Sequence, residues 1–83
     1  MDERYFVYVL RSQKDQSKIY VGFTTRLETR LAEHNDGSQI YTRRHAPWER
    51  IMYLAFSDRG KALDFEKYLK SPSGKAFASK HFA

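Results

Sequence analysis

The 83-residue chain contains no cysteine, which excludes disulfide bonds and metal sites built on thiolates. Long hydrophobic runs are absent too. The longest apolar stretches, Tyr5–Leu10 and Ile51–Phe56, have the length of single strands and are far too short to cross a bilayer. The chain also shows no internal repeat or low-complexity tract. We therefore expect one small domain spanning residues 1–83, with no membrane partner.

Acidic residues are outnumbered by basic ones. Ten Asp and Glu against 15 Lys and Arg give a formal net charge of +5 at pH 7. A basic domain of this size is compatible with binding a polyanion such as DNA. Many small proteins are equally basic without binding nucleic acid, so the charge alone does not decide between these possibilities.

Strand-like and helix-like segments alternate along the chain. Strands are predicted over residues 5–10, 19–23 and 50–56, with a polar hairpin loop at 12–17 and a short basic helix over 75–82. The first strand is apolar on both faces, which is typical of a central strand. We therefore predict an α+β fold with a three-stranded antiparallel sheet of order 2-1-3, flanked by helices.

The first helix follows the second strand directly. Thr25 and Glu28 have the spacing of a capping box, which predicts a helix from about Arg26 to His34. Gly37 is expected to end this helix, because glycine is the residue most often found just after a helix C-terminus.

Two polar residues share the apolar face of this helix. At 100° per residue, Arg30 and His34 lie on the same side as Leu27 and Leu31. Burying an unpaired charge is expensive. The two side chains therefore either lie at the rim of the face and extend to water, or belong to a functional site.

The second helix presents a similar anomaly. It is predicted from about Arg59 to Lys70, capped by Ser57 or Asp58. Glu66 lies in the middle of its apolar face, whose other members are Ala62, Leu63, Phe65 and Leu69. Glutamate is almost never fully buried without a partner. Glu66 is therefore expected either to bind a divalent cation or to form a buried ion pair with Arg30.

A long connection over residues 35–48 joins the first helix to the third strand. Long ordered loops in small domains are often functional. This one carries Arg43 and Arg44 close to Tyr41 and Trp48. We expect Trp48 to anchor the loop to the core and the two arginines to contact DNA, because basic residues between aromatic ones suit phosphate contacts and base stacking.

Five features in a fixed order carry a resemblance to a known family. Phe6-Val7-Tyr8 and Tyr20-Val21-Gly22 occupy the first two strands, Arg30 and His34 the first helix, and Glu66 the second. This order resembles the GIY-YIG nuclease family over nearly the whole chain. It is similar to small bacterial members that consist of this domain, and to the N-terminal nuclease domain found in an excinuclease.

The resemblance implies a metal-dependent endonuclease that hydrolyses DNA phosphodiester bonds, in DNA repair or the processing of structured DNA. The alternative is a non-catalytic nucleic-acid-binding module with the same fold. The catalytic residues implied are Tyr8, Tyr20, Arg30, His34 and Glu66, which we expect to converge on one concave surface. Glu66 is expected to hold one Mg²⁺ or Mn²⁺ ion and Arg30 to contact phosphate. Either tyrosine, or His34, is expected to take a proton from the attacking water.

The resemblance also implies DNA, rather than RNA, as the partner. Lys18, Gly22, Arg43 and Arg44 are the expected DNA contacts, with Gly22 letting a phosphate approach the backbone. A partner protein or a homodimer could supply specificity, and we expect a cytoplasmic location near the nucleoid. Family members often carry an asparagine on the last helix, whereas no asparagine follows Asn35 here.

Overall fold

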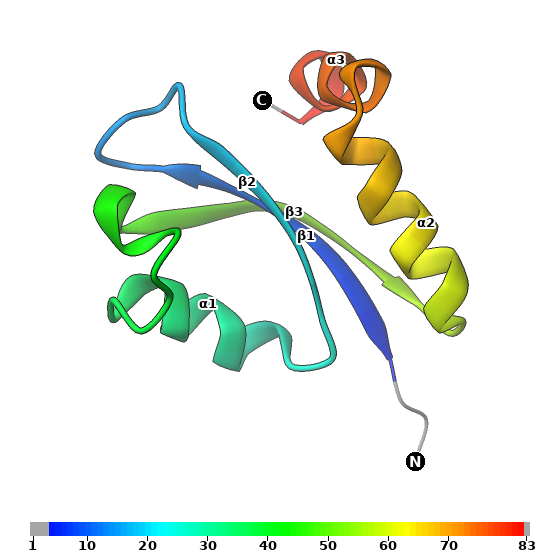
Figure 1. The fold of residues 1–83 in the computed structure, drawn as a ribbon, viewed down its shortest axis with the longest axis horizontal. Coiled ribbons are helices and arrows are strands. Elements are labelled where there is room, and N and C mark those ends of the chain that lie inside the picture. Colours follow the sequence, from blue (N-terminus) through cyan, green and yellow to red (C-terminus); the bar gives the residue numbers. More distant parts are fainter. Residues whose placement is uncertain (1–3, 83) are drawn as a thin grey trace.

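The predicted sheet is present in the computed structural model, which describes residues 4–82 (Figure 1). β1 (Tyr5–Ser12) pairs antiparallel with both β2 (Ile19–Thr24) and β3 (Trp48–Phe56). The strand order is β2-β1-β3, so the predicted order and the central position of the first strand are confirmed. The third strand begins two residues earlier than expected, because Trp48 pairs with the last residue of β1.

Helices cover both faces of the sheet. α1 (Leu27–Asn35) and a short 3₁₀ turn, η1 (Arg43–His45), lie on one face, whereas α2 (Arg59–Lys70) and α3 (Pro72–His81) lie on the other (Figure 1). None of the helices described is long and apolar enough to span a membrane.

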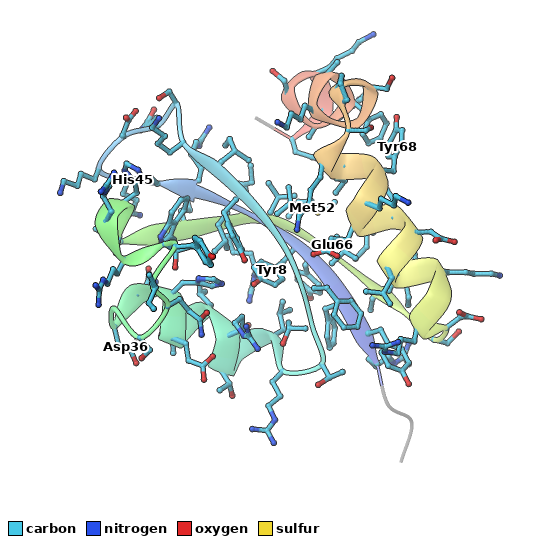
Figure 2. The ribbon with its side chains drawn as sticks, viewed as in Figure 1. Tyr8, Asp36, His45, Met52, Glu66 and Tyr68 are labelled. Atoms are coloured by element: carbon cyan, nitrogen blue, oxygen red, sulfur yellow. The ribbon has the colours of Figure 1, made fainter. Side chains whose placement is uncertain are left out.

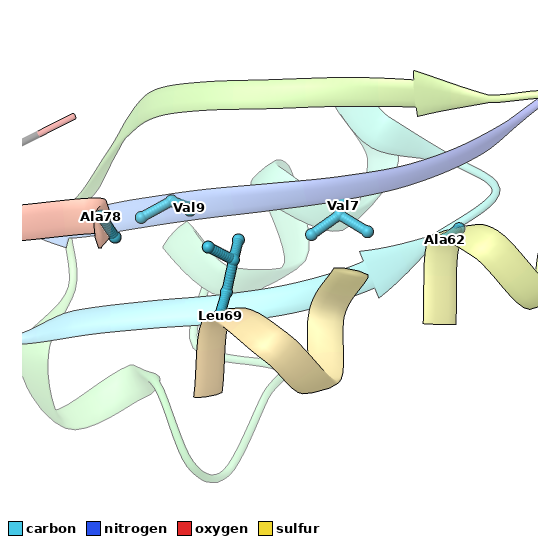
Figure 3. Packing of buried hydrophobic residues seen from close by; sticks show 5 residues of the cluster. All are labelled: Val7, Val9, Ala62, Leu69 and Ala78. Atoms are coloured by element: carbon cyan, nitrogen blue, oxygen red, sulfur yellow. The ribbon is translucent and has the colours of Figure 1, made fainter. Parts of the chain in front are cut away.

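The face under α2 and α3 is closed by small and branched apolar side chains. Val7 and Val9 of β1 are fully buried there, because alternate residues of a strand point to the same face. They pack against Ala62 and Leu69 of α2 and Ala78 of α3 (Figure 3). This cluster is the apolar core that fixes α2 on the sheet.

The other face is closed by larger and more polar side chains. Tyr8 and Leu10, the alternate residues of β1, form a second buried cluster with Trp48. Leu27 and Leu31 of α1 pack against this cluster, as their shared helix face predicts. The sheet therefore separates an apolar core from a core that contains hydroxyl and ring nitrogen groups.

The predicted capping box of α1 is wrong. The helix begins at Leu27, and its N-cap residue makes no side-chain cap bond. The Thr24 hydroxyl accepts from the backbone N–H of Arg26 at 3.0 Å, while the Glu28 carboxylate pairs with Arg50 on β3. The ion pair with Arg50 thus holds the Glu28 side chain away from the helix N-terminus, where a capping box would need it. Gly37 does end the helix, with a φ of 86° that favours glycine.

The second helix has the predicted bounds, and Asp58 caps it by accepting from the backbone N–H of Lys61 at 3.0 Å. The last helix begins at Pro72, three residues before the predicted start. Ser71 caps it by accepting from Gly74 N–H at 3.1 Å, and proline is favoured at the first helical position. A Cβ on Gly74 would lie 1.8 Å from the Tyr68 carbonyl oxygen, so this tight corner requires glycine.

Candidate active site

A tyrosine and a histidine meet in the core beneath α1. Tyr8 of β1 is 2% exposed and His34 of α1 is 1% exposed. The Tyr8 hydroxyl lies 2.8 Å from His34 Nε2, a normal hydrogen-bond distance. His34 faces inward because it is on the same side of the helix as Leu31, which packs on the sheet. We refer to these two residues as the Tyr8–His34 pair.

Gly22 makes room for the Tyr8 ring. It stands opposite Tyr8 in the β1–β2 pairing and is buried. A Cβ at Gly22 would lie 2.3 Å from the Tyr8 hydroxyl oxygen, closer than any side chain tolerates. The structure therefore explains this glycine by the ring that crosses it, whereas the sequence suggested the approach of a phosphate.

Burial keeps the His34 ring neutral. Loss of solvent lowers its pKa below the ordinary 6.5, and the nearby Arg30 guanidinium lowers it further, while Glu33 acts in the opposite direction. The second ring nitrogen, Nδ1, lies 2.7 Å from the Thr42 hydroxyl oxygen. His34 is thus held at both nitrogens, and at neutral pH it can accept a proton.

The Tyr8 phenol is neutral as well. Burial raises its pKa above the ordinary 10.0. Tyr20 and Glu66 raise it further, whereas Arg30 lowers it. A phenol in this environment does not ionise by itself at neutral pH, so Tyr8 can take a proton only if it gives up its own to an acceptor such as His34.

Tyr20 completes a cluster of rings. It is half-buried on β2, and its ring centroid lies 5.0 Å from that of His34 and 6.3 Å from that of Tyr8. It also contacts Trp48 at 6.3 Å between centroids. Trp48 is buried and donates from Nε1 to the Thr42 carbonyl at 2.8 Å, which confirms that it anchors the long connection to the core.

Arg30 lies one helical turn before His34, at the rim of the site. Its side chain is 38% exposed, and Nε lies 3.3 Å from the Glu33 carboxylate. A polar cavity of about 310 Å³ opens beside it between β2 and α1. The lining residues are Phe23, Thr24, Thr25, Arg26, Thr29, Arg30 and Glu33. This is a partly exposed guanidinium beside a hollow, with an ion pair that an incoming phosphate can replace.

Glu66 approaches from the other side of the sheet. Its side chain on α2 is 20% exposed, points from α2 toward the sheet, and pairs with Lys70 at 3.1 Å (Figure 2). α1 and α2 lie on opposite faces of the sheet, and the expected Arg30–Glu66 ion pair is wrong, because Arg30 pairs with Glu33 and Glu66 with Lys70. Both charges nevertheless shift the pKa of Tyr8, which Arg30 lowers and Glu66 raises.

The donor set around Glu66 restricts which metal it could hold. Within residues 4–82, no three His, Cys, Asp or Glu side chains are grouped so as to bind an ion together. A single carboxylate suits Mg²⁺ or Mn²⁺, because such ions keep most of their water and are often held by one or two carboxylates. The residues present therefore fit the expected ion and do not fit a dehydrated, all-protein site such as that of zinc.

The expected DNA contacts lie in two separate places. Arg43 and Arg44 are exposed on η1, next to Tyr41, whose side chain is 91% exposed. Lys18 is instead exposed at the start of β2, on a groove of about 540 Å³ that Lys70 also lines. The structure thus brings the arginines to the side of the Tyr8–His34 pair and places Lys18 toward α2 and α3.

The contact between Thr42 and His34 could not be predicted from the sequence. Thr42 is 1% exposed and reaches His34, yet it stands between the exposed Tyr41 and Arg43 in a polar loop. Only the folding of that loop back onto α1 brings the Thr42 hydroxyl to the ring.

The fold and these side chains define a GIY-YIG domain. The family model described as the GIY-YIG catalytic domain matches residues 4–80, so the chain belongs to this family. The match covers nearly the whole chain and agrees with the three-stranded antiparallel sheet of order β2-β1-β3.

Relatives of two kinds match the chain. A UPF0213 protein of Oceanobacillus iheyensis is 39% identical over 71 residues, which is 84% of this chain and 80% of the relative. The structure-specific endonuclease subunit slx1 of Aspergillus niger is 36% identical over 74 residues, covering 82% of this chain but only 18% of that protein. The solution NMR structure of a UPF0213 protein from Bacillus halodurans superposes with a TM-score of 0.57 at 26% identity, over 93% of this chain and 83% of that one.

Proposed function

We propose that this protein is a divalent-metal-dependent endonuclease that hydrolyses DNA phosphodiester bonds. The observation that carries the proposal is the buried hydrogen bond between Tyr8 and His34, with Arg30 and Glu66 both acting on the same hydroxyl. The membership of a nuclease family and the similarity to structure-specific endonuclease subunits support it.

The Tyr8–His34 pair allows the neutral Tyr8 phenol to act as a proton acceptor. When Tyr8 Oη takes a proton from the attacking water, it passes its own proton to His34 Nε2, 2.8 Å away. The water oxygen forms the new bond to phosphorus as the bond to the leaving oxygen breaks. Tyr8 remains neutral throughout and His34 becomes the imidazolium, so no isolated phenolate is formed in the buried site.

Arg30 supplies positive charge at the phosphate. Its guanidinium is partly exposed, borders the cavity between β2 and α1, and is paired with the equally exposed Glu33. Exchanging that carboxylate for a phosphate costs little, because exposed ion pairs are weak. Two N–H groups can then bind phosphate oxygens and stabilise the charge that develops during hydrolysis.

Glu66 is the residue that would hold the cation. A bound Mg²⁺ or Mn²⁺ would polarise the scissile phosphate and stabilise the leaving oxygen. Lys70 lies 3.1 Å from the Glu66 carboxylate and is solvent-exposed enough to move aside.

The DNA footprint includes Arg43 and Arg44 beside the site, and Lys18 just before the start of β2. Because the chain spans about a fifth of the slx1-type relatives, a further subunit or a second copy is the expected source of substrate selection. Branched DNA, as processed in repair near the nucleoid, is the substrate class proposed.

The alternative is a nucleic-acid-binding module that does not cleave. The raised pKa of Tyr8 and the Glu66–Lys70 pair favour it, since the phenol is held neutral and the carboxylate already has a partner. The Tyr8–His34 bond is compatible with both functions, because a buried phenol needs a hydrogen-bond partner whether or not it takes part in catalysis.

A cleavage assay decides between the two functions. Branched, nicked and single-stranded DNA are incubated with the protein in Mg²⁺, in Mn²⁺ and in a chelator. We expect metal-dependent nicking of the branched substrate that Arg30→Ala abolishes and that Arg59→Ala, at the exposed start of α2 and outside the cavity, retains. Binding without cleavage in either metal would establish the alternative.

A further inference from the structure

Thr42 is a buried hydroxyl that the proposed reaction has not used. Its oxygen lies 2.7 Å from His34 Nδ1, on the side of the ring opposite Tyr8. Both Thr42 and His34 are 1% exposed, so bulk water does not compete for this contact.

The position of Thr42 is fixed by its backbone. The Thr42 carbonyl accepts from Trp48 Nε1 at 2.8 Å and from the His45 N–H at 3.1 Å. Trp48 is held in turn by Asn35, whose side chain bonds both to its N–H, at 2.6 Å, and to its carbonyl, at 3.2 Å. These hydrogen bonds fix the backbone at Thr42, and so they fix the position of its hydroxyl beside His34.

A neutral imidazole carries one N–H, so His34 donates to only one of its two partners. If Nε2 carries the hydrogen, His34 donates to Tyr8 and cannot receive the Tyr8 proton. If Nδ1 carries it, Thr42 accepts that hydrogen and the Nε2 lone pair faces the Tyr8 hydroxyl. Only the second tautomer is compatible with proton transfer from Tyr8 to His34.

We propose that Thr42 is a positioning residue that holds His34 in the Nδ1–H tautomer, so that Nε2 is free to accept the proton of Tyr8. This inference rests on the proposed function for its kinetic consequence. The same contact serves after transfer, because the imidazolium has two N–H groups and finds an acceptor at each, Tyr8 Oη and Thr42 Oγ1. A buried cation with both donors satisfied is far less costly than one with an orphaned N–H.

The test measures the tautomer directly. Long-range ¹H–¹⁵N correlation spectra of the ¹⁵N-labelled protein near neutral pH distinguish the protonated ring nitrogen of His34 from the bare one. We expect Nδ1–H in the wild type and in Thr42→Ser, which keeps a hydroxyl. Thr42→Val removes the acceptor at nearly constant shape and is expected to move the hydrogen to Nε2.

Two controls separate this role from packing. Thr24→Val changes the other buried threonine, whose hydroxyl serves Arg26 N–H, and is expected to leave the tautomer unchanged. Tyr8→Phe removes the partner at Nε2 and is also expected to keep Nδ1–H, which shows that Thr42 and not Tyr8 sets the tautomer. Thr42→Ala removes the same acceptor and replaces Thr42→Val if the valine variant does not fold.

Cleavage provides the second measurement. Thr42→Val is expected to lower the rate by about 10- to 100-fold, the usual cost of losing an outer partner that orients a functional histidine, and Thr42→Ser to restore it. A wild type with Nε2–H, or a Thr42→Val protein whose tautomer is unchanged, overturns the assignment. A Thr42-dependent Nδ1–H tautomer in a protein that cleaves no DNA supports the role of Thr42 and rejects the proposed function instead.

Discussion

The two faces of the sheet bury different kinds of side chains. Under α2 and α3 the buried cluster consists of Val7, Val9, Ala62, Leu69 and Ala78, all without polar side-chain atoms. Under α1 the buried side chains include Tyr8, His34 and Thr42, joined by hydrogen bonds of 2.7 and 2.8 Å. Within residues 4–82 no buried side-chain nitrogen or oxygen lacks a partner.

The two faces of the sheet therefore have different roles in the domain. Apolar burial stabilises the fold on the α2 face, where packing tolerates no polar group without a partner. The α1 face accepts the cost of burying polar groups because each one finds a hydrogen bond, and it places a proton donor and acceptor out of water. Glu66 is the exception, since it belongs to the first face and acts on the second.

Among the changes that compare the two faces, substitution of Glu66 is expected to have the largest effect. Glu66→Gln keeps the shape of the side chain but removes the charge that would attract a cation, so cleavage is expected to fall by at least about 100-fold. Metal-free DNA binding should stay nearly unchanged. Asp64→Asn, which removes an exposed charge from the same helix, is the matched control. Folded Glu66→Gln protein with full activity would show that the α2 face takes no part in the chemistry.

The next effect tests the apolar face. Leu69→Ala empties a fully buried position and is expected to lower the free energy of unfolding by about 2–5 kcal/mol, measured by denaturant titration. Leu31→Ala, on the half-buried face of α1, should cost less. An equal or larger loss at Leu31 would mean that the α1 face carries the stability of the domain.

DNA binding beside the α1 face should depend on salt. Replacing Arg43 and Arg44 by alanine removes two exposed charges, so the slope of log affinity against log salt should decrease by about 1.8, or roughly 0.9 for each phosphate contact. Lys61 and Lys67, both exposed on α2, provide a double variant with the same charge loss. If the two double variants have the same salt slope, DNA binding depends on the net charge of the protein and not on η1.

The smallest effect is the pH dependence of stability. The pKa of His34 is lowered in the folded state, so the unfolded chain binds more protons once the pH falls below about 6.5. The stability contributed by keeping His34 neutral is therefore complete above that pH and lost as the pH falls through the lowered value. Unfolding titrations of the wild type should show this decline, and His34→Gln should show less of it.

The sequence predicted what local patterns control. Alternating apolar residues located the three strands, and Asp58 and Gly37 marked helix ends where the structure has them. Ser71 and Pro72 also marked a helix start, although the last helix was predicted to begin only at residue 75. The start signal of the last helix was thus present in the sequence but was not recognised.

The failures arose from contacts between distant segments. Glu28 pairs with Arg50, 22 residues away, and so does not complete a capping box. Arg30 and Glu66 were offered as an ion pair, but each instead pairs with a residue of its own helix, Glu33 and Lys70. Thr42 became visible as part of the site only when the loop was seen to fold back on His34.

The central claim is that the Tyr8–His34 pair moves the proton of the attacking water. The most direct test is the single-turnover cleavage rate of Tyr8→Phe, with DNA affinity and thermal stability measured on the same samples. This change deletes one hydroxyl and keeps the ring that fills the space over Gly22. We predict a loss of about 10²–10⁴-fold in rate with nearly unchanged DNA affinity. A Tyr8→Phe protein that cleaves at the wild-type rate would contradict the claim.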